Sequence, residues 1–241
     1  MTGDFMRGTA LITGGAKRLG REIALMLGEM GFKIALHYNK SQELAENLIC
    51  ELNNRDVVCE LFQGNLKDES SLSGLIPRVV KRFDDLSLLV NNASVFERAG
   101  LRETSFNLFE NNFLVNFKAA YFLSRDFANF CNSGHIINML DAKVAQNDIS
   151  YSAYTLSKMA LANFTIMAAK ELAPHFRVNG ISPGYILPPE KEAKDYLQKR
   201  PEKIPIQRKG EPYEITKSIA FLVENAFITG LNLYVDGGEH L

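Results

Sequence analysis

Seven short apolar segments recur along the chain, and stretches with the apolar period of an amphipathic helix separate most of them. We expect these segments to be strands at 8–13, 33–38, 57–62, 86–91, 134–140, 176–181 and 231–235. Strands that alternate with helices pair in parallel, because each helix returns the chain to the starting edge of the sheet. The sequence therefore predicts an α/β fold, a doubly wound parallel sheet of about seven strands with helices on both faces.

Length and composition limit the class of protein. At 241 residues, 46% of them hydrophobic, the chain can bury a continuous core as a single domain, 1–241. A net charge of −1 argues against nucleic acid as the main partner. No segment approaches the roughly 18 to 20 apolar residues of a membrane helix, and the first residues show no apolar signal region, so we expect a cytoplasmic protein. The scattered Cys50, Cys59 and Cys131 indicate free thiols and no metal site.

A glycine-rich turn follows the first predicted strand and opens an amphipathic helix that stops at Gly31. Residues 14–20, which form this turn, are GGAKRLG. Such a turn brings backbone N–H groups and the positive end of a helix up to a pyrophosphate, with glycine where a Cβ atom would collide. The succession of strand, glycine turn and helix indicates a Rossmann-like site for a dinucleotide.

The end of the second predicted strand indicates which dinucleotide the site prefers. Proteins that prefer NAD place an acidic residue there, on the ribose 2′-hydroxyl. Residues 37–41 are HYNKS instead, and Lys17 and Arg18 face them from the glycine turn. Together with Lys40 they make three cations with no opposing carboxylate, which favours a 2′-phosphate. We predict NADPH as the cofactor; the alternative is that Lys17 and Lys40 are ordinary solvated charges.

Three side chains are candidates for the chemistry. Tyr154 and Lys158 are four residues apart in a segment with helical period, so they share one face, and the cation can lower the pKa of the phenol. Asp141 follows the predicted strand at 134–140, at the edge where open α/β sheets place ligands. Without further context, the pair also fits a half-buried tyrosine beside a solvated lysine.

Together these motifs resemble the short-chain dehydrogenase/reductase family over nearly the whole chain. Further matching motifs are NNA at 91–93, Asn116 in the following helix, Pro183 with Gly184 after the sixth strand, and VDGG at 235–238. The resemblance implies a reductase that uses a nicotinamide cofactor, with Tyr154 and Lys158 as its reactive pair.

Three positions depart from the usual family pattern. Arg18 stands where most members have the central glycine of the loop, and Asp141 stands where they have the catalytic serine. Both departures resemble the pteridine reductase branch, as do residues 37–41 and the run NNASVF at 91–96. Asn65 stands where the family usually has an aspartate beside the adenine, and its amide oxygen can still accept that hydrogen bond.

The resemblance implies a role for each site residue. The expected catalytic residues are Asp141, Tyr154, Lys158 and Asn116, with Asn116 holding Lys158 through water. The expected substrate contacts are Arg18, Ser94, Phe96, Asp141, Tyr154 and Pro183, with Phe96 over the pterin ring. The expected NADPH contacts are Gly14, Lys17, Arg18, Leu19, Gly20, His37, Tyr38, Asn39, Lys40, Ser41, Asn65, Leu66, Asn92, Ala93, Ser94, Lys158, Pro183 and Gly184. Core packing remains an alternative for Phe96, turn capping for Ser94 and a strand-end role for His37.

The acid at position 141 narrows the reaction. An ionised carboxylate would repel the oxyanion that develops when a carbonyl is reduced. Reduction of a C=N bond instead needs hydride at carbon and a proton at nitrogen, which Asp141 with Tyr154 can relay. We therefore expect NADPH-dependent reduction of a dihydropterin, such as dihydrobiopterin or dihydromonapterin, or of dihydrofolate, to the tetrahydro form. A neutral Asp141 would mimic serine, so a carbonyl or 3-oxoacyl-thioester reductase is one alternative; an NADPH-binding sensor or scaffold with little turnover is another.

Two expectations concern the periphery of the site. A proline-bounded, charged insertion predicts a substrate lid at about 184–208, with a solvated surface helix as the alternative. The family resemblance implies a homotetramer built through helices at roughly 105–130 and 151–173, in which a neighbouring C-terminus, residues 239–241, can close the site. The aromatic residues of the first helix fit either that interface or the core.

Overall fold

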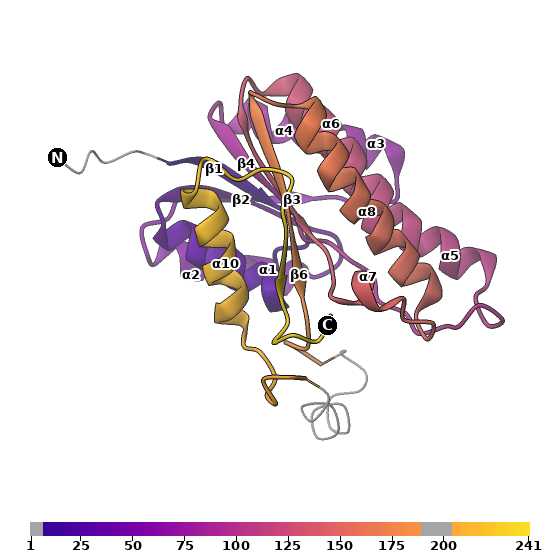
Figure 1. The fold of residues 1–241 in the computed structure, drawn as a ribbon. Coiled ribbons are helices and arrows are strands. Elements are labelled where there is room, and N and C mark those ends of the chain that lie inside the picture. The colour runs from indigo at the N-terminus through magenta and orange to yellow at the C-terminus, as the bar shows by residue number, and fades with distance from the viewer. Residues whose placement is uncertain (1–6, 189–203) are drawn as a thin grey trace.

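A parallel sheet of seven strands runs through the computed structural model, which describes residues 7–188 and 204–241 (Figure 1). The strands are β1 (Arg7–Ile12), β2 (Phe32–Tyr38), β3 (Cys59–Gln63), β4 (Leu86–Asn91), β5 (Gly134–Met139), β6 (Phe176–Pro183) and β7 (Asn232–Val235). Their order is β3-β2-β1-β4-β5-β6-β7, and all neighbours are parallel. The predicted doubly wound α/β fold is confirmed.

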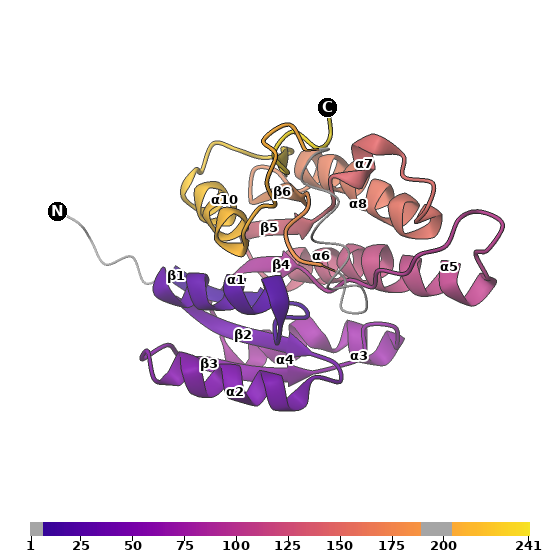
Figure 2. The same cartoon turned by 90° about the horizontal axis from the view of Figure 1, so that it is seen from below.

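Helices cover both faces of this sheet (Figures 1 and 2). On one face lie α1 (Arg18–Glu29), α2 (Gln42–Asn53) and α10 (Pro212–Glu224), and on the other lie α4 (Leu75–Arg82), α6 (Ala119–Phe130) and α8 (Ser152–Glu171). The shorter helices are α3 (Glu69–Ser73), α5 (Phe106–Phe113) and α7 (Lys143–Gln146). A π-helical turn, η1 (Leu114–Lys118), joins α5 to α6. No helix in the described part of the chain is long and apolar enough to span a bilayer.

Each face of the sheet has its own apolar core. In β1, Ala10 and Ile12 pack with α1, α2 and α10, whereas Leu11 packs with α4 and α6 on the opposite side. Successive side chains of a strand point to opposite faces, so a strand that is covered on both sides needs apolar residues at consecutive positions. This requirement explains the unbroken apolar runs of the central strands.

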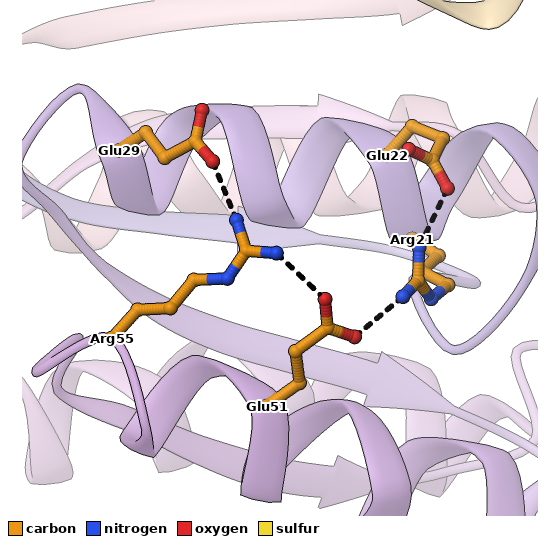
Figure 3. Close-up of polar contacts among 5 residues, drawn as sticks. All are labelled: Arg21, Glu22, Glu29, Glu51 and Arg55. Carbon is orange, nitrogen blue, oxygen red and sulfur yellow. Dashed lines mark hydrogen bonds and ion pairs between the residues drawn. The ribbon is translucent and has the colours of Figure 1, made fainter.

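An ion-pair network links α1 to α2 on the outside of the first core (Figure 3). Arg55 contacts Glu29 at 2.5 Å and Glu51 at 2.8 Å, and Arg21 contacts Glu22 at 2.7 Å. Arg21 also pairs with Glu51, so the five side chains form one continuous chain. The side chains are 32–62% exposed, and each exposed pair contributes only about 0–1 kcal/mol. The network mainly fixes how the two helices lie side by side.

The structure adds detail that the sequence pattern did not predict. The predicted strand bounds agree with the observed ones to within two residues, but the helix expected at 105–130 contains the π-helical turn. The aromatic residues of that helix are divided: Phe106 is exposed, whereas Phe117 and Phe122 pack against the cores. Most of the predicted lid, residues 189–203, lies outside the described residues.

We predict that Phe127→Ala, in α6, lowers the free energy of unfolding by about 3–5 kcal/mol, because the ring is fully buried. The matched variant Phe130→Ala lies on the same helix, 53% exposed, and should change stability by less than about 1 kcal/mol. Chemical denaturation followed by circular dichroism measures both. Equal losses in the two variants would contradict the assignment of the core.

Candidate active site

The glycine turn packs directly against the chain that follows β4. Gly14 has φ +62°, and a Cβ atom there would lie 3.0 Å from the Cα atom of Ala93. A Cβ atom on Gly20 would lie 2.4 Å from the carbonyl oxygen of Gly14. Neither position tolerates a side chain without movement of backbone, so the turn keeps its backbone open towards the crevice between β1 and β4, where the strand order reverses.

Thr13 and Asn92 hold the two loops of this crevice together. The Thr13 hydroxyl oxygen accepts hydrogen bonds from the backbone N–H groups of Asn92 at 2.9 Å and Ala93 at 3.0 Å. The Asn92 amide donates to the carbonyl oxygens of Thr13 at 2.9 Å and Gly14 at 3.1 Å. Hydrogen bonds thus join the predicted cofactor residues of the glycine turn after β1 to those that follow β4.

The start of α1 is suited to an anion. The N-cap residue, Lys17, makes no side-chain capping bond, and the first turn holds no acidic residue. The positive end of the helix dipole therefore faces the crevice without a competing carboxylate. Arg18 has φ 54°, a left-handed conformation that favours glycine. Its guanidinium donates to the carbonyl oxygen of Pro188 at 2.7 Å, so it reaches across to the chain after β6.

His37, at the end of β2, lies against the glycine turn. Its ring is buried, Nδ1 accepts from the Gly14 N–H group at 3.2 Å, and Nε2 lies 3.1 Å from the carbonyl oxygen of Gly64. Burial lowers the pKa of His37 to about 4, so the ring is neutral. Both nitrogens are occupied, and the ring supports the glycine turn, as the strand-end alternative implies. The contact of His37 with NADPH stays a prediction.

Further predicted cofactor residues lie at the ends of β2 and β3, on the same edge of the sheet. Asn39 and Lys40 are exposed, whereas Tyr38 and Leu66 are buried. Asn65 already accepts a hydrogen bond from the Lys67 N–H group at 3.3 Å through its side-chain oxygen. The carbonyl oxygen retains a second lone pair, so its predicted contact with adenine stays a prediction.

The structure brings Asp141, Tyr154 and Lys158 together at the carboxyl end of β5. The Tyr154 hydroxyl donates to Oδ2 of Asp141 at 2.6 Å, and the Lys143 N–H group donates to Oδ1 at 2.8 Å. Lys158 donates to the carbonyl oxygen of Met139 at 2.7 Å, and its Nζ lies 5.9 Å from the centre of the Tyr154 ring. A phenol, a carboxyl and an ammonium group are therefore available to exchange a proton.

Burial shifts the charged groups of this cluster in opposite directions. It raises the pKa of Asp141, against the Tyr154 hydrogen bond, the Lys143 N–H group and the charges of Lys143 and Lys158. It lowers the pKa of Lys158 to about 8, against the charge of Asp141. Both shifts bring the pKa values of the two groups closer together than the ordinary values of a carboxyl and an ammonium group.

Asn116 occupies the π-helical turn and joins the loop after β4 to helix α8. Its side-chain oxygen accepts from the N–H group of Val95 at 2.8 Å and from the Ser94 hydroxyl at 3.1 Å. Its amide donates to the Ser157 hydroxyl at 3.1 Å, one residue before Lys158. These bonds engage the Ser94 hydroxyl and position α8, but none of them reaches Lys158. The water-mediated link to Lys158 stays a prediction.

Phe96 and Tyr151 lie next to Tyr154, and we call these aromatic rings the mouth of the site. The Phe96 ring stacks on Tyr151, with centres 4.4 Å apart and planes inclined by 16°, and it meets the edge of Tyr154 at 4.7 Å. Phe96 belongs to neither apolar core of the sheet, so core packing does not explain its position. The sequence interpretation missed Tyr151. Its spacing of three residues from Tyr154 could have indicated that the two rings lie on the same side of the chain.

The end of β6 and the residues that follow it pack on the C-terminal turn. A Cβ atom on Gly184 would lie 2.7 Å from the Cα atom of Asp236, so Pro183 and Gly184 pack tightly on the C-terminal turn. Glu239 accepts from the Tyr185 N–H group at 3.1 Å, and Gln146 donates to the Glu239 carbonyl oxygen. The chain's own C-terminus thus lies against the site; closure by a neighbouring C-terminus stays a prediction.

The chain is similar in sequence to a family model and to named reductases. A family model described as enoyl-(acyl carrier protein) reductase matches residues 14–240. The 3-oxoacyl-[acyl-carrier-protein] reductase FabG of Staphylococcus aureus is 30% identical, over 98% of this chain and 99% of that protein. Pteridine reductase 1 of Leishmania tarentolae is also 30% identical, over 96% of each chain.

A solved structure shows similarity over almost the entire fold. FolM alternative dihydrofolate reductase 1 from Brucella canis, complexed with NADP, superimposes with a TM-score of 0.93 at 32% identity. The alignment covers 98% of this chain and 94% of that one. The FolM protein of Brucella suis, also in complex with NADP, gives the same TM-score and identity.

We predict that stability falls as the pH decreases from about 6.5 to about 4, partly because of His37. Its folded pKa of about 4 lies below the ordinary value of 6.5, so the unfolded chain takes up the proton first. A shift of this size corresponds to roughly 3 kcal/mol at the acidic end. His37→Gln should flatten the pH dependence of the free energy of unfolding, whereas His175→Gln, at an exposed position, should leave it unchanged. An unaltered slope in His37→Gln would refute this.

Proposed function

The chain belongs to the short-chain dehydrogenase/reductase family, and from that premise we propose that it is a pteridine reductase. The proposed reaction reduces a dihydropterin, such as dihydrobiopterin or dihydromonapterin, to its tetrahydro form, with dihydrofolate as a further candidate substrate. One observation carries the proposal: the Tyr154 hydroxyl donates at 2.6 Å to a carboxyl group, Asp141, where carbonyl-reducing members have a serine hydroxyl.

The chain is an NADPH-dependent oxidoreductase, as the NADP complexes of its relatives from Brucella support. The residues present fit this cofactor. The open start of α1 and the glycine turn suit a pyrophosphate. No acidic residue stands at the end of β2, and Lys17, Arg18 and Lys40 supply positive charge for a 2′-phosphate. NADPH, when bound, supplies the hydride; we propose that Lys158 binds its nicotinamide ribose.

The proton is the part of the reaction that this chain's own side chains control. Addition of hydride to the carbon of a C=N bond leaves nitrogen needing one proton, and the product gains one C–H and one N–H bond. Tyr154 and Asp141 share a proton in a 2.6 Å hydrogen bond, so they can pass one to that nitrogen. A carboxylate does not oppose this step, because nitrogen gains a proton where a carbonyl oxygen would develop negative charge.

The mouth of the site suits a flat, aromatic substrate. The rings of Phe96 and Tyr151 stack on each other, and the ring of Phe96 meets the ring of Tyr154 edge-on. Offset stacking of one more ring adds about 0.5–1.5 kcal/mol beyond the burial of area. We propose that Phe96, with Ser94, Arg18 and Pro183 around it, contacts the pterin.

One alternative has specific support. The FabG relative from Staphylococcus aureus is as similar in sequence as the pteridine reductase, which favours a 3-oxoacyl-thioester or other carbonyl substrate. A second alternative, a sensor or scaffold that binds NADPH with little turnover, has no need of a buried lysine next to a tyrosine and an acid. We also propose that the protein forms the homotetramer expected from the family. Light scattering measures the oligomeric state.

We predict that the purified protein oxidises NADPH with dihydrobiopterin, dihydromonapterin or dihydrofolate and not with an acetoacetyl thioester. The measurement is the loss of NADPH absorbance with each substrate at the same concentration. Turnover of the thioester alone would overturn the proposed function and make Asp141 a tolerated substitution. Absence of turnover with tight binding of NADPH would support the sensor alternative.

We predict that Tyr154→Phe lowers kcat for the dihydropterin by at least about 100-fold, because the proton donor is lost. Binding of NADPH, measured by fluorescence titration, should remain within a few-fold. Tyr213→Phe, on an exposed part of α10, is the control and should leave both values unchanged. Retention of turnover in Tyr154→Phe would show that another group supplies the proton.

Asp141→Ser separates the two enzyme hypotheses. A pteridine reductase should lose dihydropterin turnover, because serine cannot replace the carboxyl group in the proton relay. A carbonyl reductase should keep or gain turnover with the thioester, because serine restores the hydroxyl donor. Steady-state kinetics with both substrates reports the result directly.

A further inference from the structure

A buried lysine with no part in the proposed mechanism lies beside the site acid. Lys143 is the second residue after Asp141 and is only 5% exposed. Its Nζ lies 2.5 Å from Oδ2 of Asp148 and 5.0 Å from the centre of the Tyr151 ring. Burying an ammonium group is costly unless it is paired, so its burial here indicates a fixed charge.

The local backbone brings the two charges together. Helix α7 ends at Gln146, and Asn147 adopts a left-handed conformation with φ 52° that turns the chain back. Asp148 then accepts from the N–H group of Ser150 at 2.9 Å through its second carboxyl oxygen. The Thr155 hydroxyl, in the first turn of α8, donates to the Asp148 carbonyl oxygen at 3.3 Å. Asp148 is therefore anchored to α8, and Lys143 is anchored to Asp148.

Lys143 also closes a circuit of contacts around the substrate mouth. Its ammonium group lies near Tyr151, Tyr151 stacks on Phe96, and Phe96 meets the edge of Tyr154. Tyr154 donates to Asp141, and the N–H group of Lys143 donates to the other oxygen of Asp141 at 2.8 Å. The same residue thus touches the acid through its backbone and the aromatic wall through its side chain.

We propose that Lys143, held by Asp148, is a positioning residue of the active site: it supports the Tyr151–Phe96 wall and places a fixed positive charge beside Asp141. The inference rests on the proposed function in one respect, the role of Asp141 as the site acid. It does not depend on which substrate the enzyme reduces.

The balance of charges around Asp141 gives the sign of the effect. Among the described residues, the ionisable groups that act on Asp141 are Tyr154 and Lys158 from α8 and Lys143 from α7. From β6, the neighbouring contact is a backbone one, from the Ala142 N–H group to the Pro183 carbonyl oxygen. Loss of the Lys143 charge therefore raises the pKa of Asp141. Loss of the Asp148 charge leaves Lys143 uncompensated and lowers it.

The test uses two variants whose expected effects have opposite signs. The dependence of kcat/KM on pH is measured with whichever substrate the full-length enzyme turns over. In Lys143→Met, the limb that reports Asp141 should move to higher pH, and in Asp148→Asn it should move to lower pH. Lys143→Arg should restore the wild-type profile. Lys217→Met removes a similar contact, 5.2 Å from the ring of Tyr213, far from Asp141 in the chain, and is the matched control.

A purely structural role would lower the activity of both charge variants without moving the Asp141 limb of the pH profile, or would move that limb in the same direction in both. Either result would overturn the proposal. If Lys143→Met does not fold, Asp148→Asn decides alone, because a shift to higher pH or no shift contradicts the inference. The carboxyl resonance of Asp141, titrated by carbon-13 NMR without substrate, separates the two proposals. Opposite shifts of this titration with no pterin turnover would support the inference while the proposed function fails.

Discussion

The hydrogen-bonded ladder between β5 and β6 is the constraint on which the site depends. It does not stop where the strands end: Leu140 donates to Ile181 at 2.7 Å and Ala142 donates to Pro183 at 2.9 Å. Asp141 lies between these two bonds, so its backbone is as fixed as that of a central strand. A side chain held in this way can orient a proton with little loss of entropy on reaction. The reactive tyrosine is then placed by α8, which packs on β6.

Around this fixed point, the chain combines buried and half-buried charges that compensate one another. Asp141, Lys158, Lys143 and Asp148 lie within one network of hydrogen bonds and charge interactions. Each isolated charge would be expensive in such surroundings, but two acids and two bases nearly cancel. In this arrangement the side chains can gain or lose a proton while the backbone stays in place. Removal of any single member therefore changes the behaviour of the others.

The sequence was sufficient for the fold because its signals are local and repeated. Each strand is an apolar run bounded by turn residues, and the glycine turn after β1 has one compact geometry. The grouping of Asp141 with Tyr154 and Lys158 also followed from spacing and from the position of strand ends. The π-helical turn at Asn116 did not, because its hydrogen-bond pattern has no separate apolar period.

The missed residues depend on backbone turns that a sequence pattern does not show. Lys143 meets Asp148 because Asn147 reverses the chain. His37 was predicted as a cofactor residue, but the pattern did not show that its two nitrogens lie against the Gly14 N–H group and the Gly64 carbonyl oxygen. Arg18 shows another limit of sequence-based choice. Its left-handed backbone costs about 1 kcal/mol, so a designer who seeks thermostability would replace it with glycine. That choice would also remove the guanidinium that bridges the first and sixth strand ends through Pro188, a contact that glycine cannot make.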